Sequence, residues 1–375
     1  MTDTHEDPAP PEAVLVTGFP AFSATRMVQK IVATDPGASV FLLAREKFRA
    51  PAEAFIDRLP GAQRVRVRVV VGDVCDMDLG LAGSEVRELE DQVTTIHHLA
   101  GIYHLGVERA LAERVNVEGT RGVIEFAGEC RRLRRLCHWS TASVSGRRKG
   151  VVLEEELDEG QPFRNFWEET KFEAEKLARA AARRLPVTVF RPGVIVGDSK
   201  TGEIDKLDGP YYLMVLIVQD PLDLALPLPG RGAAPLHLVP IDFVVDAAVA
   251  LSKEPRAAGG TFHLTDPCPF SARTVYELVA QRADRKPPRG VIPTGLARAL
   301  LRAPGLERLA RAPLAFLEAF NHLALYNSRH TLALLDGRVR CPSFDTYVDN
   351  LVRYVREVQA QRRQRLEEEA ADPFD

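Results

Sequence analysis

The stretch AVLVTGFPAFSA (residues 13–24) decides the fold class. It begins with the run AVLVT (residues 13–17), rich in branched apolar residues, which favour a β-strand. A glycine follows at once, and beyond it the apolar positions Phe22, Met27, Ile31 and Val32 repeat at helical spacing. A strand, a tight turn and a helix in this order are the first half of a unit in which crossover helices join parallel strands.

The same alternation continues along the chain. Further apolar runs typical of strands lie at residues 40–43, 65–71, 94–99, 136–140, 187–191 and 261–264. Their near-continuous apolar character indicates strands that are buried on both faces. The segment 237–254 is expected to change from extended to helical at Pro240 and Ile241. We therefore expect an α/β fold built on a doubly wound parallel sheet, with a smaller, mainly helical lobe.

The composition argues against several classes of protein. Of the 375 residues 45% are hydrophobic and 27% are charged, as in ordinary globular proteins, and the net charge of −3 does not suggest nucleic-acid binding. Five scattered cysteines indicate reduced thiols, so we expect a cytoplasmic protein. No apolar run reaches the roughly 18 residues of a transmembrane segment, and the histidines lack metal-ligand spacing with the cysteines.

The turn after the first strand has features of a dinucleotide-binding turn. Gly18 permits a tight turn, and N–H groups at the start of the following helix are placed to face a pyrophosphate. Thr17, Gly18, Ala21 and Phe22 are the candidate contacts. The turn departs from the usual pattern, because Pro20 has no N–H and Ala21 stands where a second glycine is expected. A purely structural turn is the alternative interpretation.

The ends of later strands carry further candidates in the expected order. An acidic residue after the second strand would bind a ribose diol, whereas Arg45, with Lys47 as a second cation, suits a 2′-phosphate. We therefore expect NADP(H) in preference to NAD(H), with a surface arginine as the alternative. The candidates for the adenine and pyrophosphate sides are Asp73, Val74, Leu99, Ala100 and Gly101.

Together these motifs resemble the extended short-chain dehydrogenase/reductase family, and within it the thioester-reductase and fatty-acyl-reductase (male-sterility-type) branch. The resemblance covers roughly residues 13–355 and also rests on VNVEGT (115–120), HWSTASVSG (138–146), NFWEETKFEAEKL (165–177), RPGVIVGD (191–198) and VPIDFVVDA (239–247). It implies that Lys171, Pro192 and Val194 also contact the cofactor. It further implies NAD(P)H-dependent reduction of a carbonyl or an acyl thioester.

The resemblance also implies catalysis by a serine or threonine, a tyrosine, and a lysine four residues after the tyrosine. Thr141 and Lys171 match, but Trp167 stands at the tyrosine position. Hydride addition to a carbonyl makes an alkoxide that a phenol can protonate, whereas an indole N–H has no accessible proton to give. Losing such an acid typically lowers the rate ~10²–10⁴-fold.

Several interpretations of Trp167 are open. Thr141 and Lys171 could stabilise the oxyanion alone, a thioester adduct could collapse by expelling its thiolate, or a phenol could come from the loops expected to hold Tyr103, Tyr211 and Tyr212. The alternative to an enzyme is a pseudoenzyme that binds NADP(H) as a sensor or scaffold. A sugar-nucleotide epimerase or dehydratase is a third option, although that chemistry depends more on the missing phenol.

The resemblance implies a division of the chain into domains. We expect a tail at residues 1–12 and a Rossmann domain at 13–200, to which the segment 237–265 returns. The substrate lobe is expected at 201–236 and 266–358, and a charged C-terminal tail at 359–375.

The segment 291–327 is apolar with interleaved arginines, and is consistent with three roles: helices that cover the lobe, a channel wall for an acyl chain, or a surface that contacts a membrane or a carrier protein.

Expected partners are a small molecule or a carrier-bound thioester, with a homodimer open. We expect Glu168 and Glu169 to be solvated.

Overall fold

The computed structural model describes residues 11–103, 106–219, 225, 227–293, 295–296 and 321–371. This part of the chain forms two compact units. The first contains the described residues up to Val144, together with Phe166–Arg191 and Val245–Phe262. The second contains Ser145–Asn165, Pro192–Val244 and the described residues from His263 onward.

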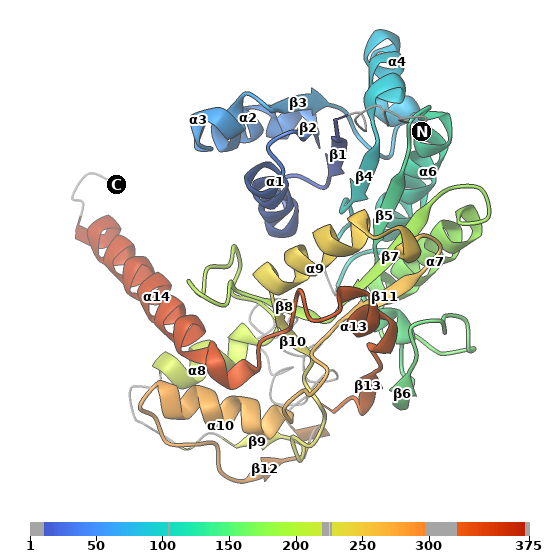
Figure 1. The fold of residues 1–375 in the computed structure, drawn as a ribbon. Coiled ribbons are helices and arrows are strands. Elements are labelled where there is room, and N and C mark those ends of the chain that lie inside the picture. The colour runs from blue at the N-terminus through green and yellow to red at the C-terminus, as the bar shows by residue number, and fades with distance from the viewer. Residues whose placement is uncertain are drawn as a thin grey trace, which may run out of the picture. The chain divides into compact units, whose positions relative to one another are not determined.

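A seven-stranded sheet organises the first unit (Figure 1), with the strand order β11-β7-β5-β4-β1-β2-β3. Its strands are β1 (Ala13–Thr17), β2 (Ser39–Ala44), β3 (Val67–Val71), β4 (Thr95–His98), β5 (Arg135–Trp139), β7 (Val187–Pro192) and β11 (Thr261–Leu264). The pairs from β3 through β1 to β7 are parallel. The expected doubly wound α/β fold is confirmed.

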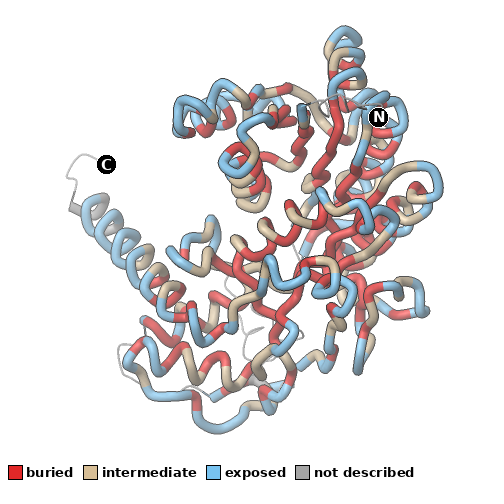
Figure 2. The backbone as a smooth tube through the Cα atoms, viewed as in Figure 1, coloured by how far each residue is buried: buried red, intermediate tan, exposed pale blue. Residues whose placement is uncertain are grey.

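Helices cover both faces of this sheet. The longer ones are α1 (Phe22–Thr34), α2 (Arg49–Asp57), α4 (Gly83–Gln92), α6 (Gly119–Glu129), α7 (Phe166–Ala181) and α9 (Ile241–Lys253). The shorter ones are η1 (Glu46–Phe48), α3 (Gly61–Arg64), η2 (Met77–Gly80), α5 (Arg109–Ala112), η3 (Glu113–Glu118), η4 (Ala142–Ser145) and η5 (Pro255–Ala257). As Figure 2 shows, the strands and the inner sides of the helices are buried.

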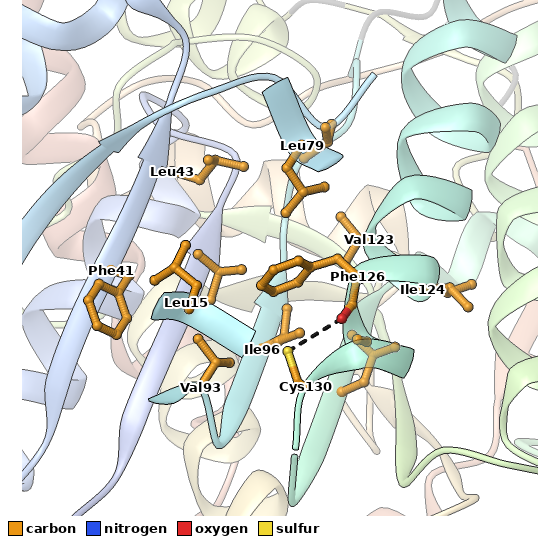
Figure 3. Close-up of a cluster of buried hydrophobic side chains, with 14 of the residues drawn as sticks. Leu15, Phe41, Leu43, Leu79, Val93, Ile96, Val123, Ile124, Phe126 and Cys130 are labelled. Atoms are coloured by element: carbon orange, nitrogen blue, oxygen red, sulfur yellow. Dashed lines mark hydrogen bonds between the residues drawn. The ribbon is translucent and has the colours of Figure 1, made fainter. Parts of the chain in front are cut away.

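The apolar core of the first unit lies between the sheet and the helices α4, α6 and α7 (Figure 3). Leu15 and Ile96 from the strands meet Phe126 of α6, and the thiol of Cys130 donates to the Phe126 carbonyl oxygen at 3.4 Å. Because side chains alternate along a strand, Val14 and Val16 face the opposite side, where α1 contacts β1 and β2. The near-continuous apolar strands of the sequence are thus explained by burial on both faces.

The second unit is built on three helices that pack against one another, α8 (Tyr211–Gln219), α10 (Ala272–Arg282) and α14 (Val348–Ala371). Its other elements are β6 (Gly150–Val152), β8 (Val194–Val196), β9 (Leu228–Pro229), β10 (Leu238–Pro240), β12 (Val291–Ile292), β13 (Ala324–Tyr326), α13 (Arg329–Leu335) and η6 (Phe344–Thr346). Short parallel pairs join β10 to β8, β12 to β9 and β13 to β6.

Several sequence-based expectations for the second unit need correction. Tyr211 and Tyr212 do not lie in a loop but begin α8, after Pro210, whose missing N–H is tolerated at a helix start. The ends of the segment 291–327 form strands β12 and β13 in place of helices. Its interior, including its four arginines, lies outside the described residues. Helix α14 continues to Ala371, so the charged C-terminal segment begins as helix, which does not contradict the expected charged tail.

A buried ion pair fixes α7 against the sheet. Glu175 is fully buried and accepts from Arg191 of β7 at 2.7 Å, from Arg179 at 2.8 Å and from the Ser140 hydroxyl at 2.6 Å. Burial alone would raise the pKa of Glu175, but Arg191, Arg179 and Ser140 outweigh it and lower that pKa below its ordinary value. The stabilisation is therefore present at neutral pH and is lost in acid, as pH falls through the lowered pKa.

We expect Glu175→Gln to destabilise the protein by about 3–5 kcal/mol, because it leaves Arg191 buried without its counter-charge. Urea denaturation at pH 7 measures the change. Glu173→Gln is the matched control on the same helix: its pair with Lys176 is exposed, so the change should stay within about 0.5 kcal/mol. Equal stability of the two variants would contradict the anchoring role of Glu175.

Candidate active site

The turn after β1 is closed by the segment that follows β4. Gly18 has a φ of +98°, and a Cβ there would lie 2.7 Å from the Ala100 nitrogen and 2.7 Å from the Leu99 carbonyl carbon. The Ala100 N–H also donates to the Thr17 hydroxyl at 3.0 Å. Residue 18 must therefore be glycine, both for its backbone conformation and for this close approach.

A directed chain of hydrogen bonds continues from Thr17 into the core. The Thr120 hydroxyl donates to the Asn116 carbonyl oxygen at 2.6 Å, so it must accept from His98 Nε2, 3.1 Å away. His98 Nδ1 then accepts from the Thr17 hydroxyl at 3.0 Å. Burial, with a smaller contribution from Lys171, lowers the pKa of His98 to about 3, so its ring is neutral. The turn is thus tied to α6 in one fixed hydrogen-bonding direction.

The start of α1 fits a pyrophosphate in part. Ala21 precedes the helix, is exposed, and donates its N–H to the Gly18 carbonyl oxygen at 2.9 Å. Phe22 is half-buried, with the guanidinium of Arg26 5.0 Å from its ring centre. The N–H groups of the first helical turn supply anion-binding donors, whereas the proline at position 20 supplies none.

Two cations lie together at the carboxyl end of β2. The guanidinium of Arg45 and the ammonium of Lys47 lie 5.2 Å and 4.9 Å from the ring centre of Phe48, and both side chains are exposed. Among the described residues no carboxylate forms an ion pair with either of them. This donor set fits a phosphate group better than a ribose diol.

The next two candidates, Asp73 and Val74, lie in the loop after β3. One carboxylate oxygen of Asp73 accepts from the Cys75 N–H at 3.0 Å, which orders the loop. Val74 is buried against α6, where a Cβ on Gly119 would lie 2.9 Å from its side chain. Packing accounts for Val74, while a role for Asp73 beside an adenine ring stays a prediction.

Lys171 is buried at the carboxyl end of β5. Its ammonium donates to the Trp139 carbonyl oxygen at 2.5 Å, and Gly101 lies so close that a Cβ there would be 3.9 Å from Nζ. Burial lowers the pKa of Lys171 to about 8, against the smaller opposing effect of Glu175. Burial, followed by the charge of Lys171, also holds the pKa of the neighbouring His138 well below its usual range, so that ring is neutral.

Thr141 and Trp167 complete the set expected for catalysis. Thr141 lies two residues after the end of β5, is buried, and accepts from the Ser143 N–H at 3.2 Å. Trp167 lies one helical turn before Lys171 on α7 and packs into a small apolar cluster with Ile102, Val107 and Ala112. All three expected catalytic positions therefore lie in the first unit, at the end of β5 and on the first turns of α7.

Pro192 and Val194, expected to contact the cofactor, belong to the second unit. Pro192 is the last residue of β7, and Val194 is the first residue of β8. The Val194 N–H donates to the His237 carbonyl oxygen at 2.9 Å. A role for either residue toward a cofactor remains a prediction.

Two residues have positions that the sequence did not predict. Asn116 lies in the π-helical turn η3, accepts from the Ile102 N–H at 2.9 Å and donates to Thr170 at 3.0 Å, so it joins the loop after β4 to α7. The quoted motif VNVEGT contained it, and a π-turn is often found at a functional site. Glu168 was expected to be solvated, but it is buried, with 3% of its surface exposed. Glu169 is half-exposed and pairs with Arg109 at 2.8 Å.

A parallel sheet with a glycine turn after its first strand, cations after its second, and a buried lysine beside its fifth defines a Rossmann-type dinucleotide-binding protein. The chain belongs to the NAD-binding family described as "Male sterility protein", whose model matches residues 16–248. The expected family is confirmed.

Individual relatives support the same placement. The chain is 26% identical over 279 residues to "Fatty acyl-CoA reductase wat" of Drosophila melanogaster, covering 64% of this chain and 53% of that protein. It is 25% identical over 286 residues to "Glycine betaine reductase ATRR" of Emericella nidulans, covering 71% of this chain but 22% of that protein. The chain thus spans about half of the first relative and a smaller part of the second.

A solved structure shares the fold over almost the whole chain. The terminal R domain from the myxalamid PKS-NRPS biosynthetic pathway is similar with a TM-score of 0.80 and 25% identity, over 93% of this chain and 91% of that one. Within the described residues, no group of three or more His, Cys, Asp or Glu side chains is arranged to hold a metal ion. No helix in the same part of the chain is long and apolar enough to cross a membrane.

We expect Lys171→Met to stabilise the protein at neutral pH. The folded pKa of about 8 lies below the ordinary 10.5, so below pH 8 the buried charge destabilises the fold by a few kcal/mol. Between pH 8 and 10.5 the folded state has lost the proton that the unfolded state keeps, so the penalty is relieved as pH rises.

Thermal unfolding of the two proteins at pH 7 and pH 9.5 measures the effect. The gain in Tm should amount to several degrees at pH 7 and should shrink at pH 9.5. Lys176→Met, at an exposed position of α7, is the matched control and should change little at either pH. A variant less stable than the wild type at pH 7 would show that contacts of the ammonium outweigh its burial.

Proposed function

We propose that the chain is an NADPH-dependent reductase of acyl thioesters or closely related carbonyl compounds. The observation that carries the proposal is the buried ammonium of Lys171 beside Gly101, at the end of β5, two residues before Thr141. A family relative named as a fatty acyl-CoA reductase and the similarity to a terminal R domain support this reaction class.

The residues of the first unit have distinct proposed roles. The turn at Thr17, Gly18, Ala21 and Phe22, the loop residues Leu99, Ala100 and Gly101, and the cations at the end of β2 would hold the dinucleotide. When bound, NADPH supplies a hydride to the substrate carbonyl carbon. Thr141 would orient the carbonyl oxygen by donating its hydroxyl proton in a hydrogen bond, and the ammonium of Lys171 would stabilise the negative charge that develops nearby.

The proposed substrate follows from the same chemistry. A thioester adduct can expel a thiolate, so its reduction to an aldehyde demands less of an acid than other carbonyl reductions. We further propose that coenzyme A or a carrier protein bears the acyl group. The domain division expected from the sequence, with a substrate lobe in the second unit, is part of this proposal.

Fluorescence titration with NADPH and NADH, followed by NADPH oxidation with octanoyl- and palmitoyl-coenzyme A, tests the proposal. We expect tighter binding of NADPH and turnover with at least one thioester. NADPH binding without turnover, and no gain from Trp167→Tyr, would favour a scaffold or sensor that has lost its activity. Failure to bind either dinucleotide would overturn the proposal.

We expect the double variant Arg45→Ala/Lys47→Ala to raise the Kd for NADPH about 10–100-fold, because charge-assisted hydrogen bonds to a phosphate contribute about 1.5–3 kcal/mol. The Kd for NADH, which lacks the 2′-phosphate, should change little. Arg49→Ala is the matched control nearby, because Arg49 is paired with Glu53 on α2. A parallel loss of NADPH and NADH affinity would place the two cations elsewhere on the dinucleotide.

A further inference from the structure

The loop after β4 is attached to the first turns of α7 by three successive residues. Gly101 lies against Lys171, since a Cβ at residue 101 would be 3.9 Å from Nζ. Ile102 donates its N–H to the Asn116 side chain, which in turn donates to Thr170.

Tyr103 completes the attachment by packing edge-on against Trp167, with the ring centres 5.0 Å apart and the ring planes at 90°. Such T-shaped pairs hold two aromatic rings in a defined relative orientation.

The spacing of these contacts gives the direction of the loop. The two residue-to-residue steps from Gly101 to Tyr103 span at most roughly 6.6 Å, and the four helical steps from Trp167 to Lys171 rise roughly 6 Å. The loop therefore runs alongside α7 in the opposite direction to the helix. It brings the Tyr103 ring to the same helical turn as the residue that replaces the expected tyrosine.

The two aromatic rings differ in how far they are buried. Trp167 is 8% exposed and packs with Val107 and Ala112, whereas Tyr103 is 58% exposed. Tyr103 is therefore the more accessible of the two rings at this turn of α7.

We propose that Tyr103 supplies the proton that the residue at position 167 cannot, with Trp167 as the positioning residue beneath it. The inference rests on the proposed reductase function. When the carbonyl carbon receives hydride, its π electrons move to the oxygen, which takes the phenolic proton of Tyr103. On collapse of the adduct the C–S bond breaks, the thiolate leaves, and the proton on oxygen returns to the Tyr103 phenolate. The overall reaction consumes the thioester, NADPH and one proton from solvent, which the thiolate takes up.

The other tyrosines considered for this role have different surroundings. Tyr211 is 1% exposed, its hydroxyl accepts from the Gly197 N–H at 2.8 Å, and burial raises its pKa far above the ordinary value. Tyr212 is partly exposed on α8, and burial also raises its pKa. Tyr212→Phe therefore serves as the matched control for removal of a phenol.

The test compares Tyr103→Phe, Tyr212→Phe, Trp167→Phe and the double variant Trp167→Tyr/Tyr103→Phe, with NADPH and octanoyl-coenzyme A. Tyr103→Phe keeps the ring and its packing against Trp167, so we expect kcat to fall about 10²-fold while the Kd for NADPH stays unchanged. Trp167→Phe keeps an aromatic ring in contact with Tyr103 and should retain most of kcat. The double variant should recover at least 10-fold over Tyr103→Phe, because it returns a phenol to the same turn of α7.

Each other outcome counts against the assignment. A Tyr103→Phe variant within about three-fold of the wild type, a loss confined to KM, or a larger loss in Tyr212→Phe would overturn it. No gain in the double variant would show that positions 103 and 167 are not interchangeable, which also contradicts it. A wild-type protein that binds NADPH but reduces no thioester would instead overturn the proposed function, and the inference with it.

Discussion

The ammonium group of Lys171 is buried at the end of β5, and the arrangement of the site depends on how that charge is accommodated. It donates to the Trp139 carbonyl oxygen, and Glu175 lies one helical turn further along α7. The adjacent rings of His98 and His138 are neutral, because burial and, to a smaller extent, the nearby charge of Lys171 lower their pKa values. A positive charge held in a poorly solvated place interacts strongly with any negative charge that develops beside it.

Much of the first unit could be predicted from local sequence. The strands at residues 13–17 and 261–264 and the change to helix at Ile241 were predicted to the residue, because branched apolar runs and helical periodicity coincide with burial there. Strands β12 and β13 are two and three residues long and show no periodicity that distinguishes them from helix. The burial of Glu168 depends on which segments cover α7, and this is a property of the tertiary structure.

The candidate site, like the fold, could be predicted from the sequence only in part. The fingerprint predicted that Gly18 forms a tight turn, but not that the turn is closed by Ala100 and connected through His98 to α6. Asn116 connects the loop after β4 to α7 from a π-helical turn, and that change of helical geometry was not predicted from the sequence. Motifs thus indicate which segments meet, whereas the hydrogen bonds between them emerge from packing.

The anchor of α7 lies two helical turns beyond its first residues. Glu175 sets the rotation of the helix through Arg191 and Ser140, whereas the residue at position 167 makes its contacts with Ile102, Val107 and Ala112 outside the sheet. The side chains of the first turn can therefore differ without loss of the contacts of Glu175 that hold α7 on the strands. In this protein the placement of α7 on the sheet is therefore separable from the identity of the aromatic side chain at residue 167.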